Sequence, residues 1–482
     1  MTLKHSHNDQ ATAETCQFLG TESFVKTVAE DIKNSESPRT IAITGYWGSG
    51  KTSCLAGVYK ELTGTSPTEI AGNKTEQKGQ HIGIWFEAWR YQNEVSPIVA
   101  LLHCIKSHFS SSKKFVDGAG KLANISILGA LTVFDGVIKQ ATGLSGFNKI
   151  NDIGEKYEKD NLLSRLATDQ INDALTQAVR ALLGKRKEKL VIFIDDLDRC
   201  EPENAYKLLE GLKLYLSIPN CTVVLAIDQQ QIERFLQKQF INLMSERKSE
   251  IDSQYSYLGV EYLEKLCQEA YRLPIPNQKQ KSDFFISHLK LLFEDENGST
   301  VIADLNEILK SYDVLPANPR RLKMISNKLA GYLRKVDGSN VKGVINENCS
   351  LFKEFNNIIE PKRSESFAAI ALIISSLSVS YRRIYESIEL RADAARDIFD
   401  FVTSEKGTNY STPSSAFYEL NKDHRTTDVQ AKYEHPSDLS IFKLKPLFDE
   451  VTGLHVYTQS TPKTICEIMH QFVNYFNHNQ VN

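Results

Sequence analysis

A short glycine-rich run at residues 41–55 constrains this chain more than any other stretch of its 482 residues. It reads IAITGYWGSGKTSCL, in which Gly45, Gly50, Lys51 and Thr52 match the phosphate-loop pattern G-x-x-x-x-G-K-[ST]. Glycine is costly unless the backbone needs an unusual φ or a ligand approaches the main chain closely. In this pattern, loop N–H groups surround a phosphate at a helix N-terminus, the lysine reaches the outer phosphates, and the hydroxyl binds Mg2+.

The segments on both sides of this loop have the required character. Residues 40–44 (TIAIT) are short, apolar and β-branched, which predicts a buried strand, and residues 52–62 are apolar at helical spacing. A purely structural glycine turn is the alternative, but the order of strand, loop and helix favours a nucleotide site. We expect its loop to consist of Gly45, Tyr46, Trp47, Gly48, Ser49, Gly50, Lys51, Thr52 and Ser53.

A second motif, which is acidic, supplies carboxylates for metal binding and catalysis, which the phosphate loop lacks. The apolar run KLVIFI at 189–194 predicts a buried parallel strand, and Asp195 and Asp196 follow it directly. Ligands bind at the carboxyl ends of such strands. We expect the Thr52 hydroxyl to bind Mg2+, Asp195 to hold the same ion through water, and Asp196 to orient or deprotonate the attacking water. The alternative is that these acids only cap the next helix.

Three further polar residues are candidates with an open alternative. Asp228 closes the apolar run TVVLAID, where it either senses the γ-phosphate or caps the following helix. Arg320 and Arg321 follow Pro319 in the first turn of an expected helix, where the helix dipole disfavours cations. Contact with the γ-phosphate would compensate the unfavourable position of these two charges. The alternative is that both side chains are simply solvated at the surface.

The composition indicates an ordinary globular chain, with 41% hydrophobic and 24% charged residues. A net charge of −3 does not indicate a nucleic-acid partner. The eight cysteines form no C-x-x-C pair, and the sequence starts with no signal peptide, so we expect reduced thiols and a cytoplasmic location. Two apolar stretches, 122–134 and 366–381, are shorter than the ~18 residues that span a bilayer. We expect no stable membrane insertion and interpret the second stretch as a buried core helix.

The order of the expected elements predicts an α/β fold. Strands at 40–44, 81–86, 189–194 and 221–228 alternate with helices, a pattern that produces a parallel sheet with both faces covered. Residues 111–160 have the character of an insertion. From about residue 277 onward helices dominate.

Five motifs of the chain resemble those of one protein family. GYWGSGKTS, WFEAWRYQ, IDDLDRCEPE, YLEKLCQEAYRLPIP and NPRRLK occur in the order typical of KAP-type P-loop NTPases, over roughly residues 20–335. The resemblance implies a three-layer α/β core with a helical lid, and ATP and Mg2+ binding by Lys51, Thr52 and Asp195. It also implies that Asp196 is the catalytic acid position. Glu87 stands where the family often has Asn or Asp, and it either couples the γ-phosphate to a neighbouring element or caps a turn.

The resemblance also suggests the domain organisation and a role. We expect a KAP-type P-loop NTPase core at 1–276, a helical lid at 277–336 and a mostly helical C-terminal domain at 337–482. Many members carry membrane-spanning helices between the glycine-rich motif and the acidic motif. In this interval the present chain has only the short apolar stretch 122–134. Bacterial members are frequently components of defence against phage or plasmids and work beside separate effector proteins.

These observations lead to one main hypothesis and several alternatives. The main hypothesis is a Mg2+-dependent ATPase whose nucleotide state controls homo-oligomer assembly or recruitment of effector proteins in a defence complex. A scaffold that binds ATP with little hydrolysis, a DNA-stimulated motor and a small-molecule kinase are the alternatives. The net charge and the absence of interleaved aromatic and basic residues disfavour the motor, and the second acid of DDLDR disfavours the kinase.

Overall fold

The computed structural model describes residues 19–67, 79–93, 97–111, 189–233, 256–293, 300–337, 363–390 and 441–448, together with single positions such as Gln77, Leu175, Val179 and Leu183. The described residues divide into two compact units: the first contains Thr21–Pro274, and the second contains those from Ile275 onward together with Leu19 and Gly20. The expected insertion at 111–160 and the apolar stretch at 122–134 lie outside the described residues, except for Ser111.

The first unit is built on a five-stranded sheet in which all paired strands run parallel. Its spatial order is β2-β3-β4-β1-β5, so β4 lies between the strand that precedes the glycine loop and the strand that ends in the acids. The strands are β1 (Arg39–Thr44), β2 (Ile82–Glu87), β3 (Leu190–Asp195), β4 (Cys221–Ile227) and β5 (Glu269–Arg272).

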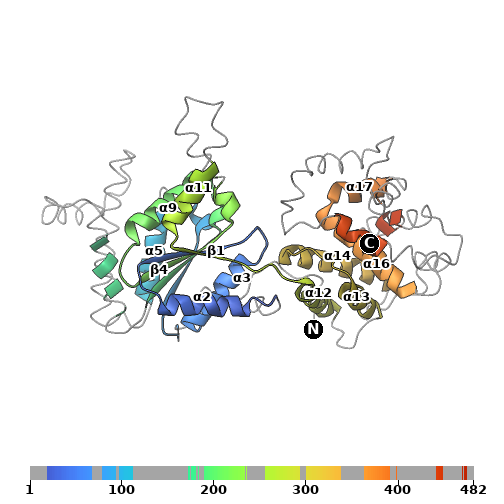
Figure 1. Ribbon diagram of the computed structural model, residues 1–482, viewed down its shortest axis with the longest axis horizontal. Helices are drawn as coiled ribbons and strands as arrows, with labels where there is room; N and C mark the ends of the chain where they lie inside the picture. Colours follow the sequence, from blue (N-terminus) through green and yellow to red (C-terminus); the bar gives the residue numbers. More distant parts are fainter. Residues whose placement is uncertain are drawn as a thin grey trace, which may run out of the picture. The chain divides into compact units, whose positions relative to one another are not determined.

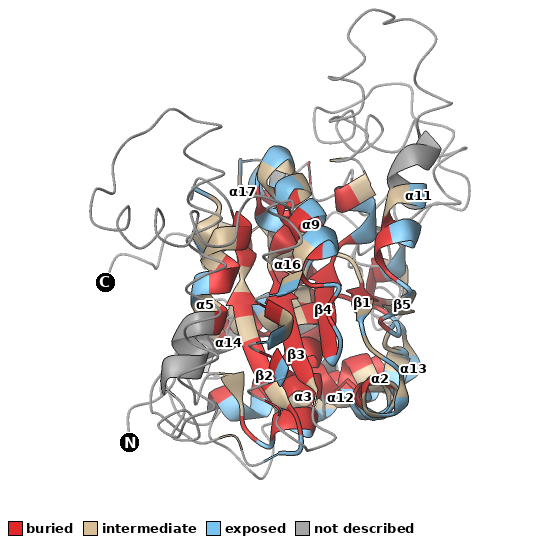
Figure 2. Cartoon of the chain, turned by 90° about the vertical axis from the view of Figure 1, so that its left-hand side faces the viewer, coloured by how far each residue is buried: buried red, intermediate tan, exposed pale blue. Residues whose placement is uncertain are grey.

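Helices cover both faces of this sheet, which gives three layers (Figure 1). Alternate residues of β3 show the division: Val191 and Phe193 pack with one layer, while Ile192 and Ile194 pack with the other. Both β3 and β4 are therefore buried along their whole length (Figure 2), as their continuous apolar sequences predict. The first layer contains α2 (Glu22–Asn34) and α3 (Lys51–Thr63), and the second contains α5 (Pro97–Ser111), α9 (Pro202–Tyr215) and α11 (Ser256–Leu266).

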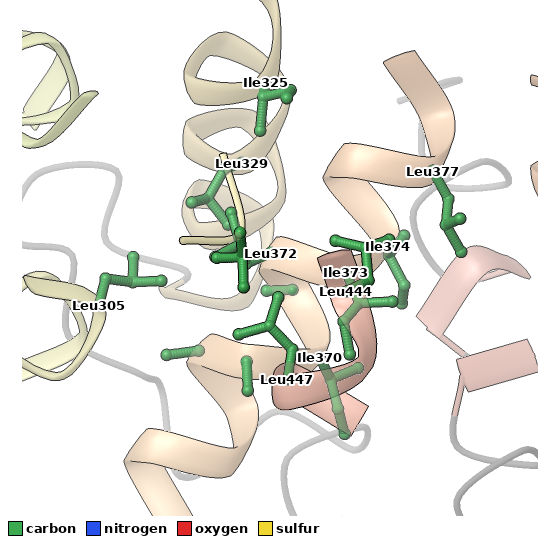
Figure 3. Packing of buried hydrophobic residues seen from close by; sticks show 14 of the residues in the cluster. Leu305, Ile325, Leu329, Ile370, Leu372, Ile373, Ile374, Leu377, Leu444 and Leu447 are labelled. Carbon is green, nitrogen blue, oxygen red and sulfur yellow. The ribbon is translucent and has the colours of Figure 1, made fainter. Parts of the chain in front are cut away.

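The second unit is helical in the part of it that the structure describes. Its helices share one hydrophobic core, part of which Figure 3 shows around Leu372 and Leu329. The helices of the expected lid and those that follow them thus share one core, and a lid at 277–336 separate from a C-terminal domain at 337–482 stays a prediction. The elements are α12 (Gln278–Phe293), α13 (Thr300–Ser311), α14 (Pro319–Asp337), α16 (Arg363–Ser380), α17 (Arg382–Leu390) and the short helix η5 (Ile441–Leu444).

The apolar stretch at 366–381 lies almost wholly in α16, at the centre of this core. Every residue from 368 to 377 is buried, including Ser375, whose hydroxyl donates a hydrogen bond to the Ala371 carbonyl at 2.6 Å. A helix that is apolar on all sides needs such complete burial, so the expected core helix is confirmed. Among the described helices, none combines the length and the apolar character needed to cross a bilayer.

The sequence predicted the α/β class correctly, and its four strands are observed to within one residue at each end. It missed the fifth strand, β5. Only four residues long, β5 lies at the sheet edge beside β1 and alternates between intermediate and exposed residues. It therefore lacks the apolar run by which the buried strands are recognised.

Candidate functional site

The candidate site forms where the strands of the parallel sheet end. Glu87 and Asp195 are register partners at the carboxyl ends of β2 and β3. Thr44 pairs with Ile227, which places Gly45 and Asp228 side by side beyond the ends of β1 and β4; the Gly45 N–H also donates to the Ile227 carbonyl at 3.2 Å. The fold thus brings the glycine loop and the acids to one edge, where parallel sheets bind ligands.

The glycine loop has the backbone that its sequence predicts. Gly48 and Gly50 have φ values of 81° and 98°, in the left-handed region that favours glycine. Gly50 precedes the first residue of α3, Lys51, so the N-terminus of this helix, the positive end of its dipole, lies at the loop. A Cβ on Gly45 would come within 2.6 Å of Ser49 Oγ, so the loop is tightly closed at its start.

The side chains of the loop differ strongly in exposure. Trp47 is 54% exposed, whereas burial raises the pKa of Tyr46 to about 12. The Ser49 hydroxyl is buried and makes no hydrogen bond to any described residue. A buried hydroxyl beside the N-terminus of a helix is one feature that a bound phosphate would satisfy. Ser53 lies in the first turn of α3.

Lys51 is buried and folded back into the loop. Its ammonium donates to the carbonyls of Gly45 at 3.1 Å and Tyr46 at 3.4 Å. It also lies 3.0 Å from Oδ2 of Asp198, a second buried charge, although that contact lacks hydrogen-bond geometry. Asp198 was not among the residues that the sequence predicted for the site. The third acid of DDLDR was the available signal, but nothing in the sequence says which of the three acids faces the lysine.

Thr52 and Asp195 come together as expected of two ligands for one metal ion. The Thr52 hydroxyl donates to Asp195 Oδ1 at 3.2 Å. Burial, followed by the neighbouring Asp196 carboxylate, raises the pKa of Asp195 to about 7. A divalent cation at this position would remove that penalty, because it stabilises the charged carboxylate. Hydroxyl and carboxylate oxygens suit Mg2+, which needs few protein ligands when phosphates supply others.

Asp196 has an unusual backbone and an engaged side chain. Its φ is 58°, so it lies in the left-handed region that non-glycine residues rarely adopt. Its carboxylate pairs with Arg199 Nε at 3.0 Å, within the short helix η3 (Leu197–Arg199) that follows it. Burial raises the pKa of Asp196, an effect that Arg199 opposes. Local strain and a raised pKa are both common at catalytic positions.

Glu87 does not cap the turn that follows it. It precedes the short helix η1 (Ala88–Tyr91) without a side-chain cap bond, and its carboxylate instead pairs with Arg90 Nε at 2.5 Å. The negative charge of Glu87 contributes to the raised pKa of Asp196, so the two carboxylates are electrostatic neighbours. Tyr91 stacks on Phe86 with 5.0 Å between ring centroids, which fixes η1 to the sheet.

Asp228 has the contacts of a helix cap. Its Oδ1 accepts a hydrogen bond from the Gln231 N–H at 3.4 Å, and its carbonyl accepts from Gln231 and Ile232. This is the capping alternative of the sequence analysis. Since Asp228 also lies beside Gly45 at the carboxyl edge, a γ-phosphate contact stays a prediction.

The two arginines belong to the second unit, in the first turn of α14. Asn318 caps this helix, because its Oδ1 accepts the N–H groups of Arg320 and Arg321 at 3.0 and 3.3 Å. Their place in a first turn after Pro319 is thus confirmed, while their contact with a γ-phosphate stays a prediction.

Histidines and cysteines provide no competing metal centre in the part of the chain that is described. No group of three or more His, Cys, Asp or Glu residues could hold a metal ion there. His470 bonds through one ring nitrogen to the Ile388 carbonyl and through the other to Asn474, which is a structural role. The Thr52–Asp195 pair is the candidate for a metal that the described residues offer.

Three features together define a P-loop NTPase domain. They are a parallel sheet between two layers of helices, a glycine loop at the N-terminus of a helix, and a buried acid at the end of β3. The profile of the KAP family P-loop domain matches residues 21–336, more than half of the chain. The chain therefore belongs to the KAP family, and the resemblance noted in the sequence is confirmed.

Two curated relatives show similarity over parts of the chain. A phage T7 exclusion protein of Escherichia coli K12 is 24% identical over 327 residues, which cover 63% of this chain but only 40% of that protein. An uncharacterized protein of Methanocaldococcus jannaschii is 29% identical over 172 residues, which cover 29% of this chain and 87% of that protein. This chain thus matches less than half of the phage exclusion protein.

Proposed function

We propose that this protein is a Mg2+-dependent ATPase whose nucleotide state controls assembly or partner recruitment. One observation carries the proposal: the Thr52 hydroxyl bonds to Asp195 at 3.2 Å beside a buried Lys51, at the carboxyl edge of the sheet. The KAP family match supports it. Two features of the loop fit a bound phosphate. The Ser49 hydroxyl is buried without a hydrogen bond, and a Cβ added to the left-handed Gly50 would have no atom within 4 Å, so there is space beside the loop.

Each residue then has a defined task. Lys51 and the loop N–H groups bind the outer phosphates, and Thr52 and Asp195 would hold Mg2+, which neutralises charge on those phosphates. Asp196 accepts the proton of the attacking water, for which a raised pKa makes it a better base. To act this way Asp196 must exchange its contact with Arg199 for the water. Glu87 lies near enough to Asp196 to influence that exchange electrostatically.

A second candidate is a nucleotide-binding scaffold with little hydrolysis. The ion pair between Asp196 and Arg199 favours it, because a base held by an arginine is not free to activate water. Turnover distinguishes the two candidates, since the scaffold predicts phosphate release at background.

We further propose a role in defence against phage or plasmids, through homo-oligomers or separate effector proteins. The name of one relative, a phage T7 exclusion protein, supports this role together with the family. A nucleic-acid partner stays an alternative, and a DNA-stimulated increase in turnover would favour it. Mass determination with and without ATP tests the assembly step.

Phosphate release by the wild type and two variants tests the enzymatic proposal. Asp196→Asn should bind ATP normally but hydrolyse it about 100-fold more slowly or worse, as expected when a catalytic base is lost. Glu203→Gln, which changes an exposed carboxylate on α9, serves as the control and should hydrolyse ATP at the wild-type rate. Wild-type release at background would contradict the ATPase and favour the scaffold.

A further inference from the structure

The buried contact between Lys51 and Asp198 is not explained by phosphate binding. A lysine ammonium has three donors, and in this chain three oxygens surround them: the Gly45 and Tyr46 carbonyls and Asp198 Oδ2. Both charged side chains are almost completely buried, at 8% and 5% exposure. Two of the three donors are therefore bonded to backbone carbonyls, and Asp198 already compensates the buried positive charge of Lys51.

Asp198 and a phosphate compete for the same cation. Like charges within about 4 Å of each other repel, and water screens this repulsion less when the charges are buried. A β- or γ-phosphate on Lys51 would place several negative charges beside the Asp198 carboxylate. Either the carboxylate moves away from Lys51 or phosphate binding loses part of its free energy.

Asp198 is also linked through the backbone of one short helical turn to Asp196, the proposed catalytic base. It lies in η3, between Leu197, which is fully buried, and Arg199, which pairs with Asp196. A displacement of Asp198 would be transmitted along this single turn to the Asp196–Arg199 pair. The same event that frees Lys51 can thus release Asp196 to face the water.

We propose that Asp198 is a positioning residue that holds Lys51 in the nucleotide-free chain and yields it to the phosphates of the nucleotide. This inference rests on the proposed function, because it assumes that the loop binds a nucleoside triphosphate. In this role Asp198 opposes nucleotide binding. A residue that only stabilises the loop, or a base that acts only during hydrolysis, would not oppose it.

Asp198→Asn tests this, since asparagine keeps the shape and an oxygen acceptor but removes the charge. The variant should bind ATP and ADP about 10-fold more tightly or better, the range that one charge-assisted contact covers. Its free form should be less stable, because Lys51 loses its counter-ion. The rise in melting temperature on adding ATP should therefore exceed that of the wild type. Asp198→Glu, which restores the charge, should return affinity toward the wild-type value.

Asp31→Asn is the matched control, because Asp31 pairs with Arg39 at 2.7 Å at the amino end of β1, away from the carboxyl edge. It should lower the melting temperature without changing ATP affinity. Unchanged or weaker ATP affinity in Asp198→Asn, with wild-type binding intact, would overturn the inference alone. If neither wild type nor Asp198→Asn binds ATP, the proposed function fails and the inference falls with it.

Discussion

Asp195→Asn should make the nucleotide-free protein more stable although it damages the site. Asp195 is 3% exposed at the end of β3, and burial with the adjacent Asp196 charge raises its pKa from 3.8 to about 7. Above about pH 7 the folded chain therefore keeps a carboxylate that would be more stable in water. Asparagine retains the contact with the Thr52 hydroxyl without that charge.

The sign and size follow from proton linkage. The folded state binds the Asp195 proton more tightly than the unfolded state, so the free energy of unfolding falls as pH rises from about 4 to about 7. Each unit of pKa difference corresponds to about 1.4 kcal/mol. Between about pH 5.5 and about pH 8, the stability advantage of Asp195→Asn should therefore grow by about 2 kcal/mol.

Urea unfolding of both proteins at these two pH values measures the difference, without Mg2+ or nucleotide. Glu203→Gln is the control, because the hydrogen bond from Lys207 lowers the pKa of this exposed carboxyl, which is therefore ionised in the folded and unfolded chain at both pH values and should show no comparable growth. Added Mg2+ and ATP should stabilise the wild type much more than Asp195→Asn. A variant that is less stable than the wild type at about pH 8 would refute the argument, because the carboxylate would then stabilise the fold.

Three further outcomes are expected. Gly50→Ala should lower stability by about 1–2 kcal/mol in thermal unfolding, because φ is 98° there; unchanged stability would contradict the left-handed loop. Arg320→Ala should weaken ATP binding by about 10- to 100-fold and leave ADP binding nearly unchanged in parallel titrations, while equal losses would indicate a structural arginine. Leu372→Ala should destabilise the second unit by about 2–5 kcal/mol in urea, because Leu372 is completely buried; a cost below 1 kcal/mol would contradict that core.

The sequence predicted the first unit well because its signals are local. A strand that is buried on both faces is a continuous apolar run, and the phosphate loop needs fixed residues at fixed spacing. The same locality predicted that Asp195 ends β3 and that α14 begins at Pro319. Each of these features depends only on residues that are close in the chain.

Features that depend on distant residues could not be predicted. The partner of Lys51 is chosen by how η3 turns after the left-handed Asp196, and three acids within four positions offered equal candidates. The choice of Asp228 as a cap likewise follows from the path of the chain beyond β4. The sequence does not reveal that the lid and C-terminal helices share one core either, because that core joins side chains from α12 through η5.

Calorimetric titration of ATP with Mg2+ into the wild type and Lys51→Ala tests the central claim most directly. The wild type should show saturable binding that strengthens with Mg2+, since Thr52 and Asp195 contribute only when the metal is present. Lys51→Ala should lose at least about 10-fold in affinity, because a buried charge-assisted contact to phosphate is removed. Equal ATP affinity in the two folded proteins would contradict the assignment of this loop as the nucleotide site.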